Sequence, residues 1–392
     1  MRILSRQVAS FLRPTGSAAA IAFLASASFA NGVAAQASAS SRANVFVQPL
    51  PPQVSTQYAD GQQVMVPMET VWRPVCGPGS STLTPPDLRQ LAASHDALMA
   101  SGPVIQVDQT HNDAGINFVF NVSGSIPAGA LGAIATAEAY MESQFNDLIT
   151  VTVNLSFATL PSNVLGGTGS SYVNVTWANA RNGLNAGKDA NDTIQSFLPT
   201  TSTIPVRYSS GAAITNETRV FFTVANYRAT IGSVAGTAAS MQYNNIFAWD
   251  FDPSNGISAG KYSFVDVVIH ETGHAMGFTS GIDFRVNDIE AIDIFRFQRT
   301  DGASDYNPDT TAEFQTRARL AAFNAPNDDQ NFDLISVEYR LSDGSPYQAS
   351  HFREQAANIG IMDPAFAAAQ TYFPNYYKAS DTNAFDAIGY DR

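Results

Sequence analysis

The chain has a single cysteine, Cys76, and few charged residues for its length of 392. A lone cysteine cannot form an intramolecular disulfide, and it excludes a structural metal site built from several thiolates. Only 14% of the residues are charged, and 34 acidic residues outnumber 21 basic ones, which gives a net charge of −13. No long basic block occurs, so we expect no nucleic-acid partner.

The sequence begins with features typical of a cleaved secretory signal peptide. Residues 1–35 carry three arginines and no acidic residue, then an apolar stretch over 18–30, then small residues up to Ala35. The apolar stretch is short and interrupted by polar residues, which argues against a membrane anchor. We therefore expect export, to the extracellular space or the periplasm, with cleavage near Ala35. No later segment is long and apolar enough to span a bilayer, so we expect no membrane association after cleavage.

The whole sequence is 45% hydrophobic, and the part after residue 35 predicts an α+β domain behind a leader. Residues 36–114 are rich in Ala, Ser, Gln and Pro and are interpreted as a loosely structured leader or possible pro-segment. From Gly115 onward, apolar and polar residues alternate in several segments, which is typical of strands with one buried face. We expect strands over 116–122, 149–157, 172–177, 219–225 and 245–251, and helices over 127–145 and 263–277. This order predicts a mixed sheet with helices packed on it.

The segment His270-Glu271-Thr272-Gly273-His274 indicates a metal centre. On a helix, positions i and i+4 share one face, so two imidazole nitrogens can reach one ion while the glutamate lies beside them. Zinc hydrolases use this arrangement: the histidines hold a Lewis acid, and the carboxylate takes a proton from the attacking water. Ser263 and Asp266 form a capping box that favours a helix start at this point.

The spacing of residues after the predicted helix does not determine which residue is the third zinc ligand. Gly277 ends the predicted helix, and three residues later stands Ser280, a poor zinc ligand. Asp283 and Glu290 lie nearby, and a carboxylate can bind zinc. The remaining histidines are His95, His111 and His351. His351 shortly precedes the segment Ile361-Met362-Asp363-Pro364.

The two segments together resemble the metzincin zinc endopeptidases. His270 to Phe278 is similar to their zinc-binding helix, and Met362 is similar to the methionine of their Met-turn, a hydrophobic floor beneath the metal. Most of that clan place the third histidine where this chain has Ser280. The leishmanolysin branch inserts a long segment after the glycine and supplies the third histidine ahead of the Met-turn. His351 has a similar position in this chain. The resemblance is therefore to an exported, bacterial-type, leishmanolysin-like member.

The resemblance implies a site and a metzincin-like architecture. It assigns His270, His274 and His351 as zinc ligands, Glu271 as general base and Met362 as structural support. It also implies a twisted mixed sheet with an active-site helix in a subdomain over 115–278. A smaller C-terminal subdomain over 279–392 would carry the Met-turn.

The charge of the ligands agrees with this assignment. Three neutral imidazoles leave zinc dipositive, which favours deprotonation of a water molecule, whereas a carboxylate ligand would reduce that charge. We therefore favour His351 over Asp283 or Glu290. The sequence predicts a secreted zinc-dependent endopeptidase that acts on a protein or peptide. The alternative is an exported binding or adhesive protein with a structural or inert zinc site. Such a site would not need a general base such as Glu271.

Other segments carry weaker signals. Cys76, three residues after Arg73, resembles the latency cysteine of matrixin and leishmanolysin leaders, whose thiolate occupies the open zinc position. The alternative is a free thiol of no consequence. Asp250 and its neighbours depart from a calcium loop and are interpreted as a surface turn. Residues 292–297, with Asp293 and Arg296, are expected to form a half-buried strand. Residues 381–390 are expected to form a helix with Asp381 as N-cap.

Overall fold

The structure is a computed structural model. It describes residues 103–108 and 115–392, apart from 191, 210, 284–286, 300–305, 324–329 and 345–346, together with Ala97, Ala100 and the backbone of four strands between 44 and 75. Residues Arg42–Arg392 form one compact unit. The predicted signal peptide over 1–35, Cys76, His95 and His111 lie outside the described residues.

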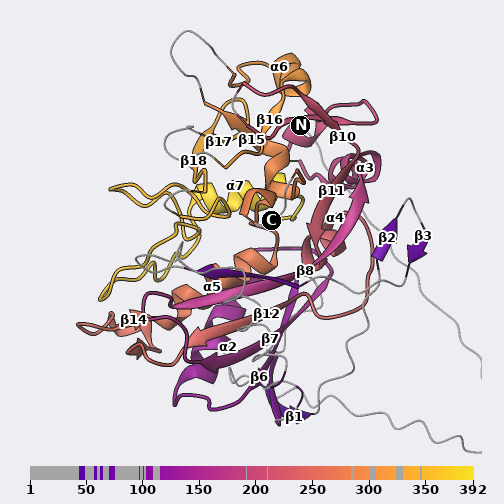
Figure 1. Ribbon diagram of the computed structural model, residues 1–392. Helices are drawn as coiled ribbons and strands as arrows, with labels where there is room; N and C mark the ends of the chain where they lie inside the picture. The colour runs from indigo at the N-terminus through magenta and orange to yellow at the C-terminus, as the bar shows by residue number, and fades with distance from the viewer. Residues whose placement is uncertain are drawn as a thin grey trace, which may run out of the picture. The chain divides into compact units, whose positions relative to one another are not determined.

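An eight-stranded mixed sheet forms the centre of the fold (Figure 1). Its strand order is β1-β5-β6-β7-β12-β8-β11, and β4 pairs with β8. β7 pairs in parallel with both β6 and β12, and the other pairs are antiparallel. The strands are β1 (Asn44–Gln48), β4 (Thr70–Val75), β5 (Val104–Asp108), β6 (Asn117–Ser123), β7 (Thr150–Ala158), β8 (Gly166–Thr176), β11 (Arg219–Thr223) and β12 (Ala239–Asn244).

Six α-helices occur in the described part of the chain, which confirms the predicted α+β class. They are α2 (Ala130–Glu142), α3 (Trp177–Gly187), α4 (Val224–Thr230), α5 (Phe264–Ala275), α6 (Thr311–Thr316) and α7 (Ala379–Ala387). α2 packs against α5, and α5 lies along β8 (Figure 1). No helix of the described residues has the length and apolar character needed to cross a bilayer.

Small side chains on β8 allow α5 to lie close to the sheet. Gly166, Thr168 and Ser170 alternate along the strand and therefore share one face. The hydroxyls of Thr168 and Ser170 donate to the backbone carbonyls of Glu271 and His274, at 3.1 Å and 3.2 Å. This face of β8 thus fixes the helix that carries the predicted metal ligands.

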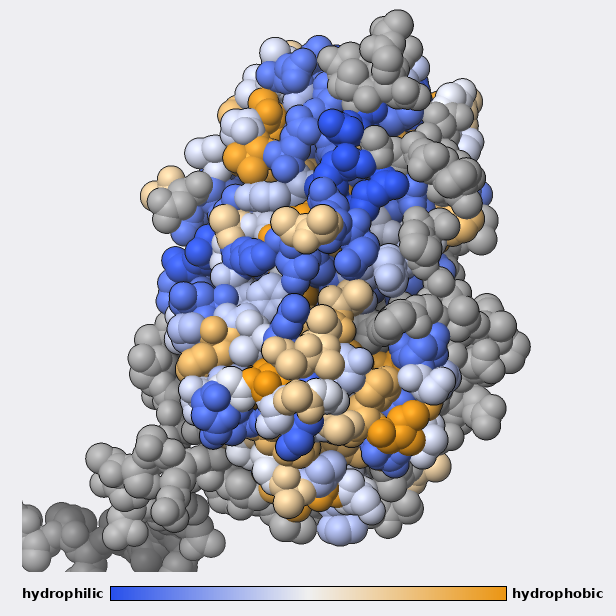
Figure 2. Space-filling model, turned by 90° about the vertical axis from the view of Figure 1, so that its left-hand side faces the viewer, coloured by the Kyte–Doolittle hydropathy of each residue, from blue (hydrophilic) through white to orange (hydrophobic). Residues whose placement is uncertain are grey.

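The remaining strands of the described residues are short and form four smaller sheets. β15 (Arg296–Gln298), β17 (Gln330–Asp333) and β18 (Glu338–Leu341) form an antiparallel sheet. β9 (Ile204–Arg207), β10 (Thr215–Glu217) and β16 (Arg319–Leu320) form a second small sheet. β13 (Trp249–Asp250) pairs with β14 (Tyr262–Ser263), and β2 (Gln57–Ala59) with β3 (Gln62–Val64). Figure 2 shows a face that is mostly hydrophilic above and carries more apolar residues below.

The helices over 127–145 and 263–277 and the strands over 116–122 and 149–157 are confirmed, with ends shifted by a few residues. The predicted strand over 245–251 is wrong in its position. β12 ends at Asn244, whose side-chain amide donates to the carbonyls of Pro161 and Val164 at 2.9 Å and 2.7 Å. Only Trp249 and Asp250 of the predicted segment lie in a strand.

Two further local predictions need correction. Residues Ala291–Phe295 form a 3-10 helix, and β15 begins only at Arg296. Asp293 and Arg296 are fully buried, because the two charges pair at 2.9 Å. Asp381 is not the N-cap of the last helix, which begins at Ala379 after Lys378; its carboxylate accepts from the Lys378 amide at 2.8 Å.

Three strands of the main sheet come from the predicted leader. β1, β4 and β5 all lie within 36–114, and the sequence analysis did not predict them. β4 pairs with residues 166–171 of β8, so backbone from the leader lies along the strand that supports α5. The division into a leader and two subdomains at 114 and 278 stays a prediction.

Candidate metal centre

Local signals at both ends define α5. The Ser263 hydroxyl accepts from the Asp266 amide at the N-terminus, as the capping prediction requires. The Asp266 carboxylate accepts from the Ser263 hydroxyl, from Thr371 and from the Tyr372 amide, so it also fastens a distant segment to the helix. At the C-terminus, Gly277 has φ of +112° and allows the Phe278 amide to donate to the Gly273 carbonyl at 3.0 Å.

The fold brings His351 to the two histidines of α5. All three side chains are buried, and one nitrogen of each lies within 4.8 Å of those of the other two. The ring of His351 lies 5.3 Å from that of His270 and 4.9 Å from that of His274, between centroids. These three residues are therefore close enough to hold one metal ion.

Hydrogen bonds at Nδ1 determine which nitrogen each ring presents. The Nδ1 atoms of His270, His274 and His351 lie 2.6, 2.8 and 3.2 Å from the carbonyl oxygens of Ile361, Phe278 and Gln348. A carbonyl oxygen only accepts, so each Nδ1 must carry the proton. Each neutral ring then keeps its lone pair on Nε2, and a carbonyl on the opposite nitrogen is the usual outer partner of a metal-binding histidine.

The electrostatics of the rings fit a cation. Burial lowers the pKa of His270 to about 4, so this ring is neutral at physiological pH. Its Nε2 lies only 3.0 Å from Nε2 of His274. Two lone pairs at this distance repel each other, and a shared cation would turn that repulsion into binding. The donor set thus fits a divalent metal that prefers nitrogen ligands.

Glu271 lies between these histidines in sequence and is fully buried. Thr168 donates its hydroxyl to Oε2, while Oε1 has no hydrogen-bond partner among the described residues. Burial raises the pKa of Glu271 well above its usual range, and the bond from Thr168 opposes that shift. A Cβ at Gly166 would lie 3.4 Å from Oε1, so the glycine keeps space open beside this oxygen.

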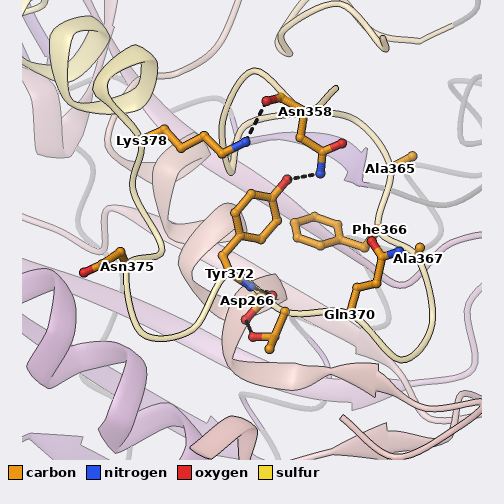
Figure 3. A pocket seen from close by; sticks show the side chains of 10 residues that line it. Asp266, Asn358, Ala365, Phe366, Ala367, Gln370, Tyr372, Asn375 and Lys378 are labelled. Carbon is orange, nitrogen blue, oxygen red and sulfur yellow. Dashed lines mark hydrogen bonds between the residues drawn. The ribbon is translucent and has the colours of Figure 1, made fainter. Parts of the chain in front are cut away.

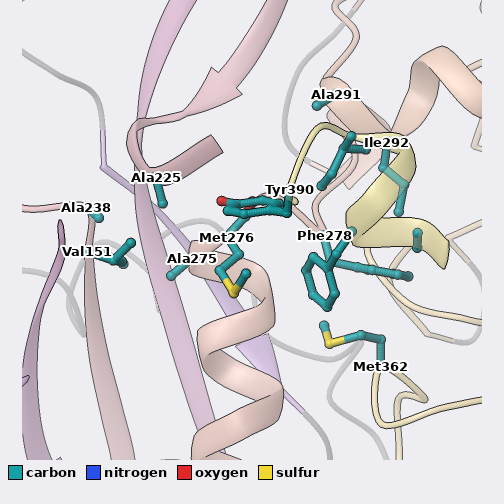
Figure 4. Close-up of a cluster of buried hydrophobic side chains, with 14 of the residues drawn as sticks. Val151, Ala225, Ala238, Ala275, Met276, Phe278, Ala291, Ile292, Met362 and Tyr390 are labelled. Carbon is teal, nitrogen blue, oxygen red and sulfur yellow. The ribbon is translucent and has the colours of Figure 1, made fainter. Parts of the chain in front are cut away.

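Met362 lies beside α5 (Figure 4). A Cβ built on Gly273 would collide with its Sδ atom, so the two residues are in close contact. The Asp381 carboxylate accepts from the amides of Ile361 and Met362 at 2.9 and 3.1 Å. The same turn therefore places Met362 against α5 and supplies the Ile361 carbonyl that fixes His270.

The alternative third ligands have other roles. The Asp283 carboxylate accepts from the amides of Ala349 and Ser350 at 2.7 and 2.9 Å. Glu290 caps the 3-10 helix at 291–295. The Ser280 hydroxyl donates to Asp293 at 2.6 Å. Neither carboxylate belongs to the group of three side chains that could share an ion.

A pocket of about 460 Å³ adjoins the centre (Figure 3). Phe366 lies in its lining and packs edge-on against His270, with 5.3 Å between ring centroids. Tyr372 contacts Phe366 and lies beneath the ammonium of Lys378, 5.4 Å from its ring centroid. Asp266 lies one helical turn before His270, so pocket and histidines share one side of α5.

Sequence reasoning did not identify Thr168 or Asp381 as parts of the site. Thr168 lies in Gly166-Gly167-Thr168-Gly169-Ser170, and this run of small residues within a strand signals close approach of another element. Asp381 is predicted as the N-cap of the last helix, but it occupies position N3, one turn further into the helix. Comparison of the chain with family models, with curated proteins and with solved structures gives no match in any of the three.

Proposed function

We propose that the protein is a secreted zinc-dependent endopeptidase of the metzincin type, similar to leishmanolysin. The observation that carries this proposal is the combination of three buried imidazoles, each presenting Nε2, with the buried carboxylate of Glu271. A purely structural metal site has no use for such a carboxylate. The His270–His274 spacing and the position of Met362 support the family assignment.

Zinc is the metal that best suits these ligands. It accepts imidazole nitrogen readily, and catalytic sites typically combine three protein ligands with one open position. Three neutral donors leave the full charge of the ion in place. Bound zinc would act as a Lewis acid on the scissile carbonyl and lower the pKa of a water molecule beside Glu271.

Glu271 would serve as the general base. Its Oε2 is held by Thr168, which fixes the carboxylate, and its Oε1 is left to take a proton from the attacking water. A buried carboxylate held in this way can accept a proton and then pass it to the leaving amine. Gly166 leaves room beside Oε1 for the reacting groups.

The pocket beside His270 would receive part of the substrate. A peptide whose carbonyl lies at the histidines would extend past Phe366, and a neighbouring side chain would enter the pocket that Phe366, Tyr372 and Lys378 line. The pocket volume of about 460 Å³ is sufficient for a large side chain.

Two measurements on purified protein test this proposal. Wild type should contain one zinc per chain, and His270→Ala, His274→Ala and His351→Ala should each lose it. Fluorogenic peptides should be cleaved by wild type, and a chelator should abolish cleavage. Glu271→Gln should keep its zinc and its fold but lose hydrolysis. Zinc retained without any peptide cleavage would favour a binding or adhesive protein instead.

A further inference from the structure

His351 differs from the other two histidines in how it is held. His270 and His274 are fixed by a packed helix, whereas no helix or strand carries His351. Its carbonyl accepts from the Ser342 amide at 3.0 Å, and its ring donates to the Gln348 carbonyl just before it. The orientation of this third ring therefore depends on what holds the preceding residues.

The Asp283 carboxylate holds those residues directly. Its Oδ1 accepts from the Ala349 amide at 2.7 Å, and its Oδ2 accepts from the Ser350 amide at 2.9 Å and from the Ser350 hydroxyl. Ser350 also accepts from the Ser280 amide at 3.0 Å, which ties it to the chain just after α5. Charge-assisted bonds of this kind are stronger than neutral ones.

A buried ion pair holds the backbone carbonyl groups of the same segment. The Arg296 guanidinium donates to the Ala349 carbonyl at 2.7 Å and to the Ser342 carbonyl at 2.9 Å. Asp293 orients the guanidinium through Nε at 2.9 Å. Ala349 is thus held at its amide by Asp283 and at its carbonyl by Arg296, so its backbone has little freedom to rotate.

We propose that Asp283 is a positioning residue that orients His351 toward the metal, with Arg296 holding the opposite side of the same backbone. This inference rests on the proposed zinc site. Asp283 is not itself a ligand, because its two oxygens are already used by the backbone amides and hydroxyl of Ala349 and Ser350. Loss of an outer-shell partner typically weakens metal binding about 10–100-fold, and we expect this range for Asp283→Asn.

The test measures zinc affinity of the full-length protein by competition with a chelating indicator. Asp250→Asn is a matched control, because Asp250 accepts from the amide and hydroxyl of Ser258 in the same manner but its loop carries no proposed ligand. Asp283→Asn should bind one zinc at saturation with affinity lowered about 10–100-fold. The cobalt-substituted variant should also show an altered visible absorption spectrum. Asp250→Asn should match wild type in both.

Other outcomes overturn the inference in distinguishable ways. Wild-type affinity in Asp283→Asn would show that Asp283 does not position His351. Complete loss of zinc at saturation, with the metal-free fold intact, would make Asp283 a ligand. If Asp283→Asn does not fold, Ser350→Ala removes the hydroxyl contacts with Asp283 and Ser280 and keeps the two amide contacts of Asp283. Unchanged zinc affinity in that variant would equally contradict the positioning role of Asp283. Absence of zinc from wild type would refute the proposed function itself.

Discussion

The Sδ atom of Met362 lies so close to Gly273 that it leaves no room for a Cβ there. Gly273 lies in the last turn of the helix that carries His270 and His274, so the methionine packs against bare backbone between the two histidines. Glycine normally weakens a helix interior by about 1 kcal/mol relative to alanine. At this position glycine is required, because a Cβ would collide with Met362.

Gly273→Ala should therefore destabilise the protein although alanine favours helices. Overpacking of a core typically costs about 1–3 kcal/mol, and the displaced methionine should also disturb the turn that fixes His270. Urea unfolding and zinc content measure the two effects. Gly132→Ala is the matched control, since Gly132 also lies within a helix but a Cβ there meets no other atom within 4 Å.

Gly132→Ala should be neutral or stabilising by up to about 1 kcal/mol. Combining Gly273→Ala with Met362→Ala should recover part of the lost stability, because the second change removes the atom that collides. A double variant whose losses simply add would show that Gly273 and Met362 are not coupled.

Thr168→Val should impair catalysis through Glu271. The hydroxyl of Thr168 lowers the pKa of Glu271 and holds Oε2, so its removal should raise that pKa further. The acidic limb of the peptidase pH profile should therefore move to higher pH, because a hydrogen bond to the charged carboxylate is lost. Thr168→Ser keeps the hydroxyl and should retain the wild-type profile. An unmoved acidic limb in Thr168→Val would contradict this role.

Asp147 should make stability depend on pH. Burial and the nearby charge of Asp391 raise its pKa from 3.8 to about 7. Between pH 4 and 7 the folded state therefore holds a proton that the unfolded state has released, so this group lowers the unfolding free energy as pH rises. Asp147→Asn should remove that part of the slope and stabilise the protein at pH 8 by about 1–3 kcal/mol.

Urea unfolding of wild type and Asp147→Asn at pH 4, 6 and 8 gives the difference in their unfolding free energies as a function of pH. Asp391→Asn should act in the same direction but more weakly, because it removes the neighbouring charge and leaves Asp147 buried. Parallel curves for wild type and Asp147→Asn would mean that the Asp147 carboxyl titrates alike in the folded and unfolded states.

Removal of the metal should lower the unfolding temperature. Zinc would join α5 to the segment that carries His351, and a ligand that binds only the folded state stabilises it by about 3–4 kcal/mol at concentrations 100–1,000 times its dissociation constant. Calorimetry with chelator, and after zinc is restored, measures this shift. His351→Ala should unfold at the same temperature under both conditions, and a persistent zinc-dependent shift in that variant would argue against His351 as ligand.

The parts of the fold that depend on local signals could be predicted from the sequence. α5 was predicted with both ends, because Ser263 and Gly277 act on neighbouring backbone and the histidine spacing follows from helix geometry. The structure confirms that His351 joins these histidines. Its association with the Met362 turn was the useful signal.

The contacts that hold His351 could not be predicted in this way. Asp283 reaches its partner 66 residues further along the chain, and Arg296 reaches Ala349 over 53 residues. Alternation of Asp293 and Arg296 with apolar residues indicated a half-exposed strand, yet mutual neutralisation lets both enter the core. Local patterns carry no information about such pairing, because the partner lies on another element.

The pairing of β4 with β8 has a consequence for any shortening of the chain. β4 covers the backbone of residues 166–171, the stretch whose side chains support Glu271. Cleavage that released residues up to 114 would leave a row of donors and acceptors open along that stretch, next to the base. An extended polypeptide could then pair with the exposed edge of β8 as a new strand. Whether residues up to 114 remain attached would therefore decide whether this edge is covered or open to such a polypeptide.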